Sequence, residues 1–251
     1  MDGTTEPIIV VIGHPIAGNP SQLAIERSLA KLGLEWRVLS FDVAPNDVAK
    51  ALDGFSVTGI QGVMIDPSIR NQAMQWYAQY AELDEAAVID CLDMGDDGRF
   101  KGTYERKNWI NDLIDSREFE TTRWIGELPS DGEAIPPVVD PDKLSAAPSL
   151  IPPEPETIAA ADLILLADLP AEINEDDPLE AEAWPENDGT SLVIDLTSGH
   201  VDAARIARRG YQFVSALEIQ TGTLQRCLHR WTGEDVSSET IAEAIEEYLG
   251  V

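Results

Sequence analysis

The sequence predicts an α/β protein from the alternation of two patterns, and its length and composition indicate a folded chain of one or two domains. Apolar runs typical of buried strands alternate with segments of helical periodicity through roughly the first 100 residues, which is the pattern of a parallel sheet with crossover helices. The chain has 251 residues, which allows one large domain or two small ones. Hydrophobic residues make up 43% of it, enough to build a core. A wholly disordered chain is therefore excluded.

The N-terminal half supplies most of the predicted elements. Strands are expected at residues 7–13, 36–41, 59–65 and 86–92, and helices at residues 21–32, 45–52 and 69–80. Asp96-Asp97-Gly98 is typical of a turn that begins a hairpin.

The composition changes after about residue 115. Eight prolines between residues 129 and 155 exclude helices of any length there. Further strands are expected at 122–126, 137–140, 161–167 and 191–196, an acidic surface stretch at 172–188, and closing helices at 217–231 and 238–249. A serine cap at Ser237 or Ser238 would open the last helix.

The charge is strongly negative, with 46 acidic residues against 17 basic ones and a net charge of −29. Such a surface repels polyanions, so nucleic acid is not expected as a partner. With 5 Lys beside 12 Arg, the composition resembles that of salt-adapted proteins, although an ordinary acidic cytoplasmic protein has the same character. The N-terminus lacks the basic charge of a signal peptide, and no apolar run reaches membrane-helix length. We expect a cytoplasmic protein without a membrane partner.

Cysteine usage is sparse. Cys91 and Cys227 lie far apart in sequence and form no CxxC motif. This argues against a disulfide framework and against a cysteine-based zinc site, so no metal is expected.

Several short motifs, taken in order, resemble those of the shikimate dehydrogenase family. They are Ile12-Gly13-His14-Pro15-Ile16, Gly33-Leu34, Gly59-Ile60-Gln61-Gly62-Val63, Gly210-Tyr211 and Trp231-Thr232-Gly233. Enzymes of that family interconvert 3-dehydroshikimate and shikimate with NADP(H). The resemblance implies a two-domain fold, with residues 1–106 and 217–251 forming a shikimate dehydrogenase-like catalytic (substrate) domain and residues 107–216 a reduced Rossmann-like domain.

The resemblance also assigns the substrate positions. The HSxSP serines fall on Asn19 and Ser21, and the Asn, Thr and catalytic Lys of NVTxPxK fall on Met64, Asp66 and Arg70. The Asn of AVNT falls on Asp90, and the catalytic Asp of GxNTD falls on Arg106, with Glu105 the neighbouring acid.

These replacements change the chemistry that the positions allow. A lysine can lose its proton and act as an acid and a base, whereas the guanidinium of Arg70 stays protonated. Asp66 and Asp90 would repel an anionic substrate unless Arg70 or Arg106 pairs with them. We therefore expect Asn19, Ser21, Asp66, Arg70, Asp90 and Arg106 to cluster in an interdomain cleft with at least one Arg–Asp pair.

The cofactor motif is more degraded. Of the family's GxGGxxxA turn only Gly126 remains, and the next predicted strand follows too soon to leave room for a phosphate-binding helix. No cofactor is expected, or NADP if the protein is an active enzyme.

Three functions stay open on these grounds. The first is an inactive or repurposed shikimate dehydrogenase-like protein that binds a small anionic or polar molecule or a partner protein. The second is an active oxidoreductase that uses Glu105, His14 or water for proton transfer, although the sequence shows no acid partner for His14. The third is a scaffold subunit.

Single residues also have purely structural interpretations: Ser21 as a helix cap, and Arg70 and Arg106 as surface residues. The sequence does not decide whether the chain forms a homodimer.

Overall fold

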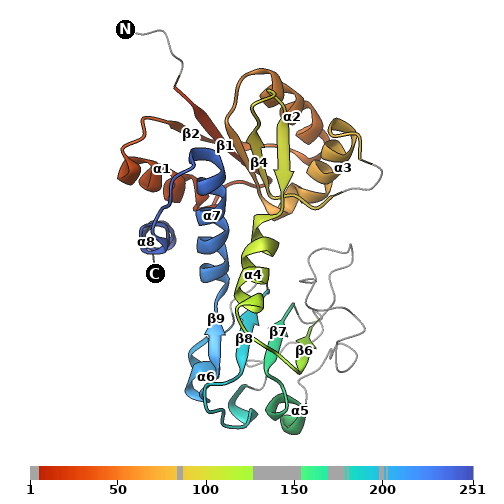
Figure 1. Cartoon of the computed structure of the whole chain (residues 1–251), viewed down its shortest axis with the longest axis vertical. Helices are drawn as coiled ribbons and strands as arrows, with labels where there is room; N and C mark the ends of the chain where they lie inside the picture. Colours follow the sequence, from red (N-terminus) through yellow and green to blue (C-terminus); the bar gives the residue numbers. More distant parts are fainter. Residues whose placement is uncertain are drawn as a thin grey trace. The chain divides into compact units, whose positions relative to one another are not determined.

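A computed structural model describes residues 6–83, 87–126, 154–168, 179, 181–197, 201 and 203–250. The chain divides into two compact units, residues 1–109 with 220–251 and residues 110–219 (Figure 1). The strand expected at 137–140 and residues 172–178 and 180 of the expected acidic stretch lie outside the described residues. Among the described residues, no helix is both long enough and apolar enough to cross a membrane.

The first unit contains a five-stranded sheet in the order β2-β1-β3-β4-β5. Its strands are β1 (Ile8–Gly13), β2 (Arg37–Asp42), β3 (Gly62–Ile65), β4 (Cys91–Met94) and β5 (Phe100–Thr103). Its helices are α1 (Ser21–Leu32), α2 (Val48–Val57), α3 (Arg70–Tyr80), the first part of α4 (Glu105–Asp115), most of α7 (Ala216–Thr232) and α8 (Ser238–Leu249), with short 3₁₀ turns η1 (Pro45–Asp47) and η2 (Pro67–Ile69).

From β1 the chain adds β2 on one side and then crosses over to add β3 on the other side, so the order in which strands are added reverses at β1. β1 pairs in parallel with β2 on one side and with β3 on the other, whereas β4 and β5 are antiparallel to their neighbours. Because parallel crossovers are right-handed, the reversal puts α1 and α2 on opposite faces of the sheet. The carboxyl ends of β1 and β3 therefore meet at a topological switch point, the usual ligand position in α/β sheets.

The core follows from the alternation of side chains along β1. Val10 and Ile12 join the cluster that α2 and α3 cover, and Trp76 of α3 is its largest side chain. Ile9 and Val11, which point to the opposite face, are also buried. On that side of the sheet, α1 and α8 pack against each other.

The second unit contains a four-stranded sheet in the order β6-β7-β8-β9, with all strands parallel. Its strands are β6 (Thr122–Ile125), β7 (Leu163–Leu166), β8 (Leu192–Asp195) and β9 (Gln212–Val214), and its described helices include α5 (Pro155–Ala159), the 3₁₀ turn η4 (Ala181–Ala183) and α6 (Ala203–Arg208). The two sheets confirm the predicted α/β class.

The fourth strand differs from its prediction, because it spans Cys91–Met94 rather than residues 86–92. Ile89 is buried in the core without belonging to a strand, and Cys91 is the residue that pairs with Met64 of β3. The apolar run therefore indicates burial correctly but not strand register.

Candidate functional site

Hydrogen bonds link the carboxyl ends of β1, β2 and β3 in what we call the strand-end cluster: His14, Asn19, Ser21, Asp42, Asp66 and Ser68. The β1–β2 register places Gly13 opposite Asp42, and the backbone N–H of Asp66 donates to the carbonyl of Ile12. A Cβ at Gly13 would lie 2.7 Å from the Cβ of Asp66. The strand ends thus approach so closely that only glycine fits at position 13.

Asp66 lies near the centre of this cluster. One carboxylate oxygen accepts a hydrogen bond from the backbone N–H of Ser68 at 2.9 Å, and the other accepts from the side-chain amide of Asn19 at 2.8 Å. The amide oxygen of Asn19 in turn accepts from the backbone N–H of Ser21. The predicted residues Asn19, Ser21 and Asp66 are therefore brought together directly.

Ser21 begins α1, and its hydroxyl is the most conspicuous polar group of this segment. The residue is only 1% exposed, and within the described part of the chain its Oγ has no hydrogen-bond partner. The interpretation of Ser21 as a cap is wrong, because α1 is preceded by Pro20 and has no side-chain cap. A buried hydroxyl that lacks a protein partner has an unsatisfied hydrogen bond, which an ordered water or a ligand can supply.

His14 has an acid partner that the sequence does not reveal. Its Nδ1 lies 2.7 Å from Oδ1 of Asp42, at the end of the neighbouring parallel strand. Its backbone N–H donates to Oγ of Ser68 at 3.0 Å, so hydrogen bonds fix both the backbone and the ring of His14. The two side chains are about half exposed, at 47% and 53%.

A second group of predicted residues surrounds the N-terminus of α4. The carboxylate of Asp90 accepts from the backbone N–H groups of Glu105 and Arg106, at 2.7 and 2.9 Å. Burial raises the pKa of Asp90 to about 6, although these hydrogen bonds and the charge of Arg70 act in the opposite direction. Asp90 therefore serves as the cap of α4.

Arg70 is buried in the same group, with 5% of its surface exposed. Its guanidinium carbon lies 5.2 Å from the centre of the Tyr104 ring, within the range of a cation–π contact. The charge of Arg70 also favours the ionised form of Asp90. This Arg–Asp interaction is of the kind that the sequence predicts, but the guanidinium of Arg70 cannot shuttle a proton as a lysine would.

Glu105 is 2% exposed, and its side chain faces α7. Its carboxylate accepts from Nε of Arg226 at 2.7 Å and lies 3.6 Å from the guanidinium of Arg230. Burial alone would raise the pKa of Glu105, but the hydrogen bond from Arg226 and others outweigh it, and the pKa is lowered. The geometry therefore gives Glu105 a structural partner rather than access to a ligand.

Other predicted residues are less informative. Met64 lies on β3, where it is partly buried and pairs with Cys91 of β4. Arg106 is partly buried and contributes its backbone N–H to Asp90. Cys91 and Cys227 are both free and fully buried. No group of three or more His, Cys, Asp or Glu side chains among the described residues could hold a metal ion.

The carboxyl edge of the second sheet begins at Gly126, which has φ of +109°. A Cβ on this residue would collide with the backbone of Ala167 and Asp168, so the glycine is required by close packing of the protein against itself. Asp195 at the end of β8 is buried, and its carboxylate accepts from the backbone and hydroxyl of Thr197. Among the residues described at this edge, Gly126 therefore has a packing role and no phosphate-binding turn is seen.

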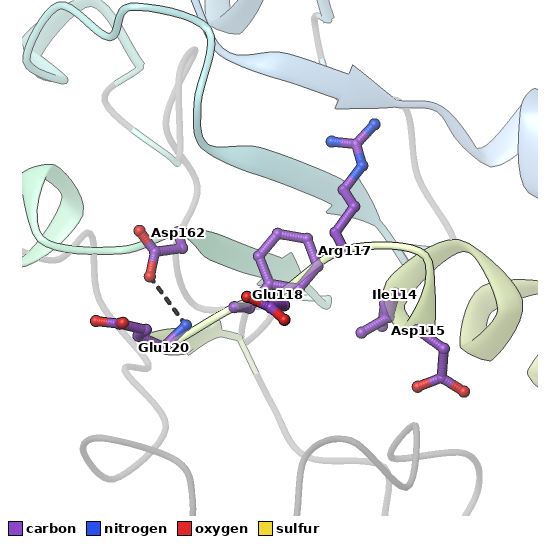
Figure 2. Close-up of a pocket in the computed structure, with 7 residues that line it drawn as sticks. Ile114, Asp115, Arg117, Glu118, Glu120 and Asp162 are labelled. Carbon is purple, nitrogen blue, oxygen red and sulfur yellow. Dashed lines mark hydrogen bonds between the residues drawn. The ribbon is translucent and has the colours of Figure 1, made fainter.

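A pocket of about 540 Å³ in the second unit lies at the opposite edge of its sheet, where β6 and β7 begin. Figure 2 shows its lining side chains and the bond from the backbone N–H of Glu120 to Asp162. The lining residues are Ile114, Asp115, Arg117, Glu118, Phe119, Glu120 and Asp162. Ligands of parallel sheets bind at carboxyl ends, so this acidic pocket is not positioned as a nucleotide site.

No protein-family model matches the sequence, and no curated protein matches it significantly. Solved structures do match in fold. A shikimate dehydrogenase in complex with NADP⁺ has a TM-score of 0.73 at 17% identity, over 96% of this chain and 95% of that one. Shikimate 5-dehydrogenase from Thermus thermophilus, in complex with shikimate, has a TM-score of 0.72 at 18% identity, over 98% of this chain and 100% of that one.

A third match has a different substrate in its name. The ligand-free 5-ketofructose reductase of a Gluconobacter species has a TM-score of 0.68 at 14% identity, over 98% of this chain and 99% of that one. The chain therefore has the two-unit α/β fold of the shikimate dehydrogenases and of related reductases. This confirms, at the level of fold, the resemblance that the sequence motifs indicate.

Proposed function

We propose that this chain is a divergent shikimate dehydrogenase-like protein whose strand-end cluster binds a neutral, polyhydroxylated small molecule, and that it does not oxidise shikimate. The observation that carries the proposal is the burial of the Arg70 guanidinium. At the position that the resemblance assigns to the catalytic lysine, a guanidinium is buried over Tyr104 and compensates Asp90. A guanidinium stays charged, so it cannot take and return a proton.

The charges of the site support a neutral ligand. Asp42 and Asp66 both lie at the carboxyl ends of the strands, in a chain whose net charge is −29. An anionic ligand there would be repelled, whereas hydroxyl groups can donate to carboxylate oxygens and accept from the buried hydroxyl of Ser21. The match to a 5-ketofructose reductase, whose named substrate carries no carboxylate, agrees with this choice of ligand class.

The test compares shikimate with its methyl ester, which keeps the hydroxyl groups and removes the charge. Isothermal titration at pH 8 should show the ester binding at least tenfold more tightly than shikimate. The variant Asp66→Asn, which is matched in shape, should reduce this preference because it removes a negative charge from the site. Tighter binding of shikimate, or no binding of either compound and none of 5-ketofructose, would contradict the proposal.

The cofactor part of the proposal is that the second unit binds neither NADP nor NAD usefully. It is supported by the packing role of Gly126 and by the acidic carboxyl edge. A thermal-shift scan with both cofactors should show no stabilisation, since a ligand at 100 times its dissociation constant would add about 2.7 kcal/mol. A dissociation constant in the low micromolar range would overturn this part.

A further inference from the structure

The pairing of His14 with Asp42 fixes which imidazole nitrogen carries a proton. A carboxylate can only accept hydrogen bonds, so the 2.7 Å contact requires a proton on Nδ1 of His14. In the neutral imidazole, Nε2 is then the unprotonated nitrogen with an available lone pair. Asp42 therefore both orients the ring and selects its tautomer.

The Nε2 atom remains accessible to a ligand. Nearly half of the His14 side chain is exposed, and within the described residues no protein group is hydrogen-bonded to Nε2. The backbone contact to Ser68 anchors the residue while leaving this edge of the ring open.

The position of His14 adds an independent argument. The residue follows β1 directly, at the switch point where β2 and β3 lie on either side of that strand. Through Ser68 it joins the same hydrogen-bonded chain as Asp66 and Asn19. A second pair in this unit, His229 with Asp235 at 3.0 Å, has the same Nδ1 geometry but lies near the end of α7, away from the parallel strand ends.

We infer that His14 is a ligand-recognition residue of the strand-end cluster, whose Nε2 accepts a hydrogen bond from a hydroxyl group of the neutral ligand, and that Asp42 is its positioning residue. The inference rests on the proposed function, because it takes the same site and ligand class. It adds the atom that receives the hydroxyl group and explains why a histidine and an aspartate are paired at this edge.

The first arm of the test needs no ligand. The chain has three histidines, so each imidazole can be assigned by single substitution in a long-range ¹H–¹⁵N spectrum. At pH 8 the spectrum should show His14 as the Nδ1–H tautomer. The variant Asp42→Asn, which keeps His14, should introduce the Nε2–H tautomer. A wild-type His14 that is mainly Nε2–H would overturn the inference.

The second arm adds methyl shikimate to the same samples. The Nε2 resonance of His14 should move on binding, and His14→Phe should weaken affinity at least tenfold, with Asp42→Asn intermediate. The matched control His229→Phe should leave affinity unchanged, since that ring lies away from the strand ends. Because the Nε2 resonance is followed in the wild-type protein, the test survives a folding defect in either variant.

The outcomes separate the two proposals. Binding of the ester with an unmoved Nε2 resonance and unchanged affinity in His14→Phe overturns the role of His14 but leaves the proposed function intact. Tighter binding of shikimate than of the ester, with a moved Nε2 resonance, contradicts the neutral-ligand proposal and supports the role of His14. No binding of methyl shikimate and none of 5-ketofructose overturns both.

Discussion

At the scale of single residues, Asp90 has a structural role, because its carboxylate caps a helix. It is 3% exposed and caps α4 through two backbone N–H groups. The resemblance assigns this position to an asparagine that binds substrate, but here the side chain is directed to the backbone of Glu105 and Arg106. Its energetic contribution should depend on pH.

The sign of the change in unfolding free energy with pH follows from the pKa of Asp90. Burial raises the pKa of Asp90 from 3.8 to about 6, so between these values the folded state binds a proton that the unfolded state has lost. Stability from this group is present at low pH and is lost as pH rises through 6. Relative to Asp90→Asn, the wild-type free energy of unfolding should fall by about 1.4 kcal/mol from pH 5 to pH 7.5. Urea unfolding measures this, and a constant or rising difference would refute it.

The pairing of His14 with Asp42 could not be predicted from the sequence. The two residues are 28 positions apart, and they meet because β1 and β2 align Gly13 with Asp42. Strand register depends on packing across the whole sheet and cannot be read from either segment alone. The contact of Asn19 with Asp66 is predicted as part of a cluster only through the resemblance, and its hydrogen bond depends on the same convergence of strand ends.

At the scale of elements, the pairing of Glu105 with Arg226 ties α4 to α7 within the first unit. The acid is 2% exposed and Arg226 is 36% exposed, so the pair is only partly screened by water. An ion pair on the surface, Arg27 with Glu247, has a similar separation of 3.0 Å but both side chains are more than half exposed. The two pairs allow a matched comparison.

Glu105→Gln should lower the free energy of unfolding by about 1–3 kcal/mol, because it removes the charge of a buried carboxylate that accepts from the guanidinium of Arg226. Glu247→Gln makes the same chemical change on the surface and should cost less than about 0.5 kcal/mol. Urea unfolding of both variants measures the difference. Equal effects would show that the Glu105 pair does not hold α4 to α7.

Elements with clear end signals are predictable from sequence. The bounds of α1 and α8 agree with the predicted 21–32 and 238–249, because Gly33 ends α1 in the left-handed region and Ser237 caps α8. In contrast, α4 and α6 are absent from the prediction, since α4 begins at a cap supplied by Asp90 from elsewhere in the chain. A tertiary cap leaves no local sequence signal.

At the scale of the whole molecule, the net charge of −29 should oppose the compact state. Added salt screens this repulsion, and the Debye length falls from about 10 Å at 0.1 M to about 3 Å at 1 M. The melting temperature should therefore rise between 0.1 and 1 M NaCl. A melting temperature that is flat or falls with salt would contradict this expectation.

The fold class is predictable because alternating strands and helices and the order of the glycine motifs extend along much of the chain. The division of the chain into catalytic and nucleotide-type domains stays a prediction in its functional sense, as do the catalytic roles of individual residues. What the sequence could not supply is the set of partners: Asp90 with α4, Glu105 with Arg226, and His14 with Asp42.

We propose that this chain, which has the fold of the shikimate dehydrogenases, has lost the acid–base chemistry of that reaction at the positions of Arg70 and Arg106. The most direct measurement is shikimate-dependent formation of NADPH by the purified protein, followed by absorbance across the neutral to alkaline pH range. We expect no rate above that of a sample without protein. Turnover at roughly 1–10³ s⁻¹, the range typical of enzymes, would contradict it and would show that another group transfers the proton.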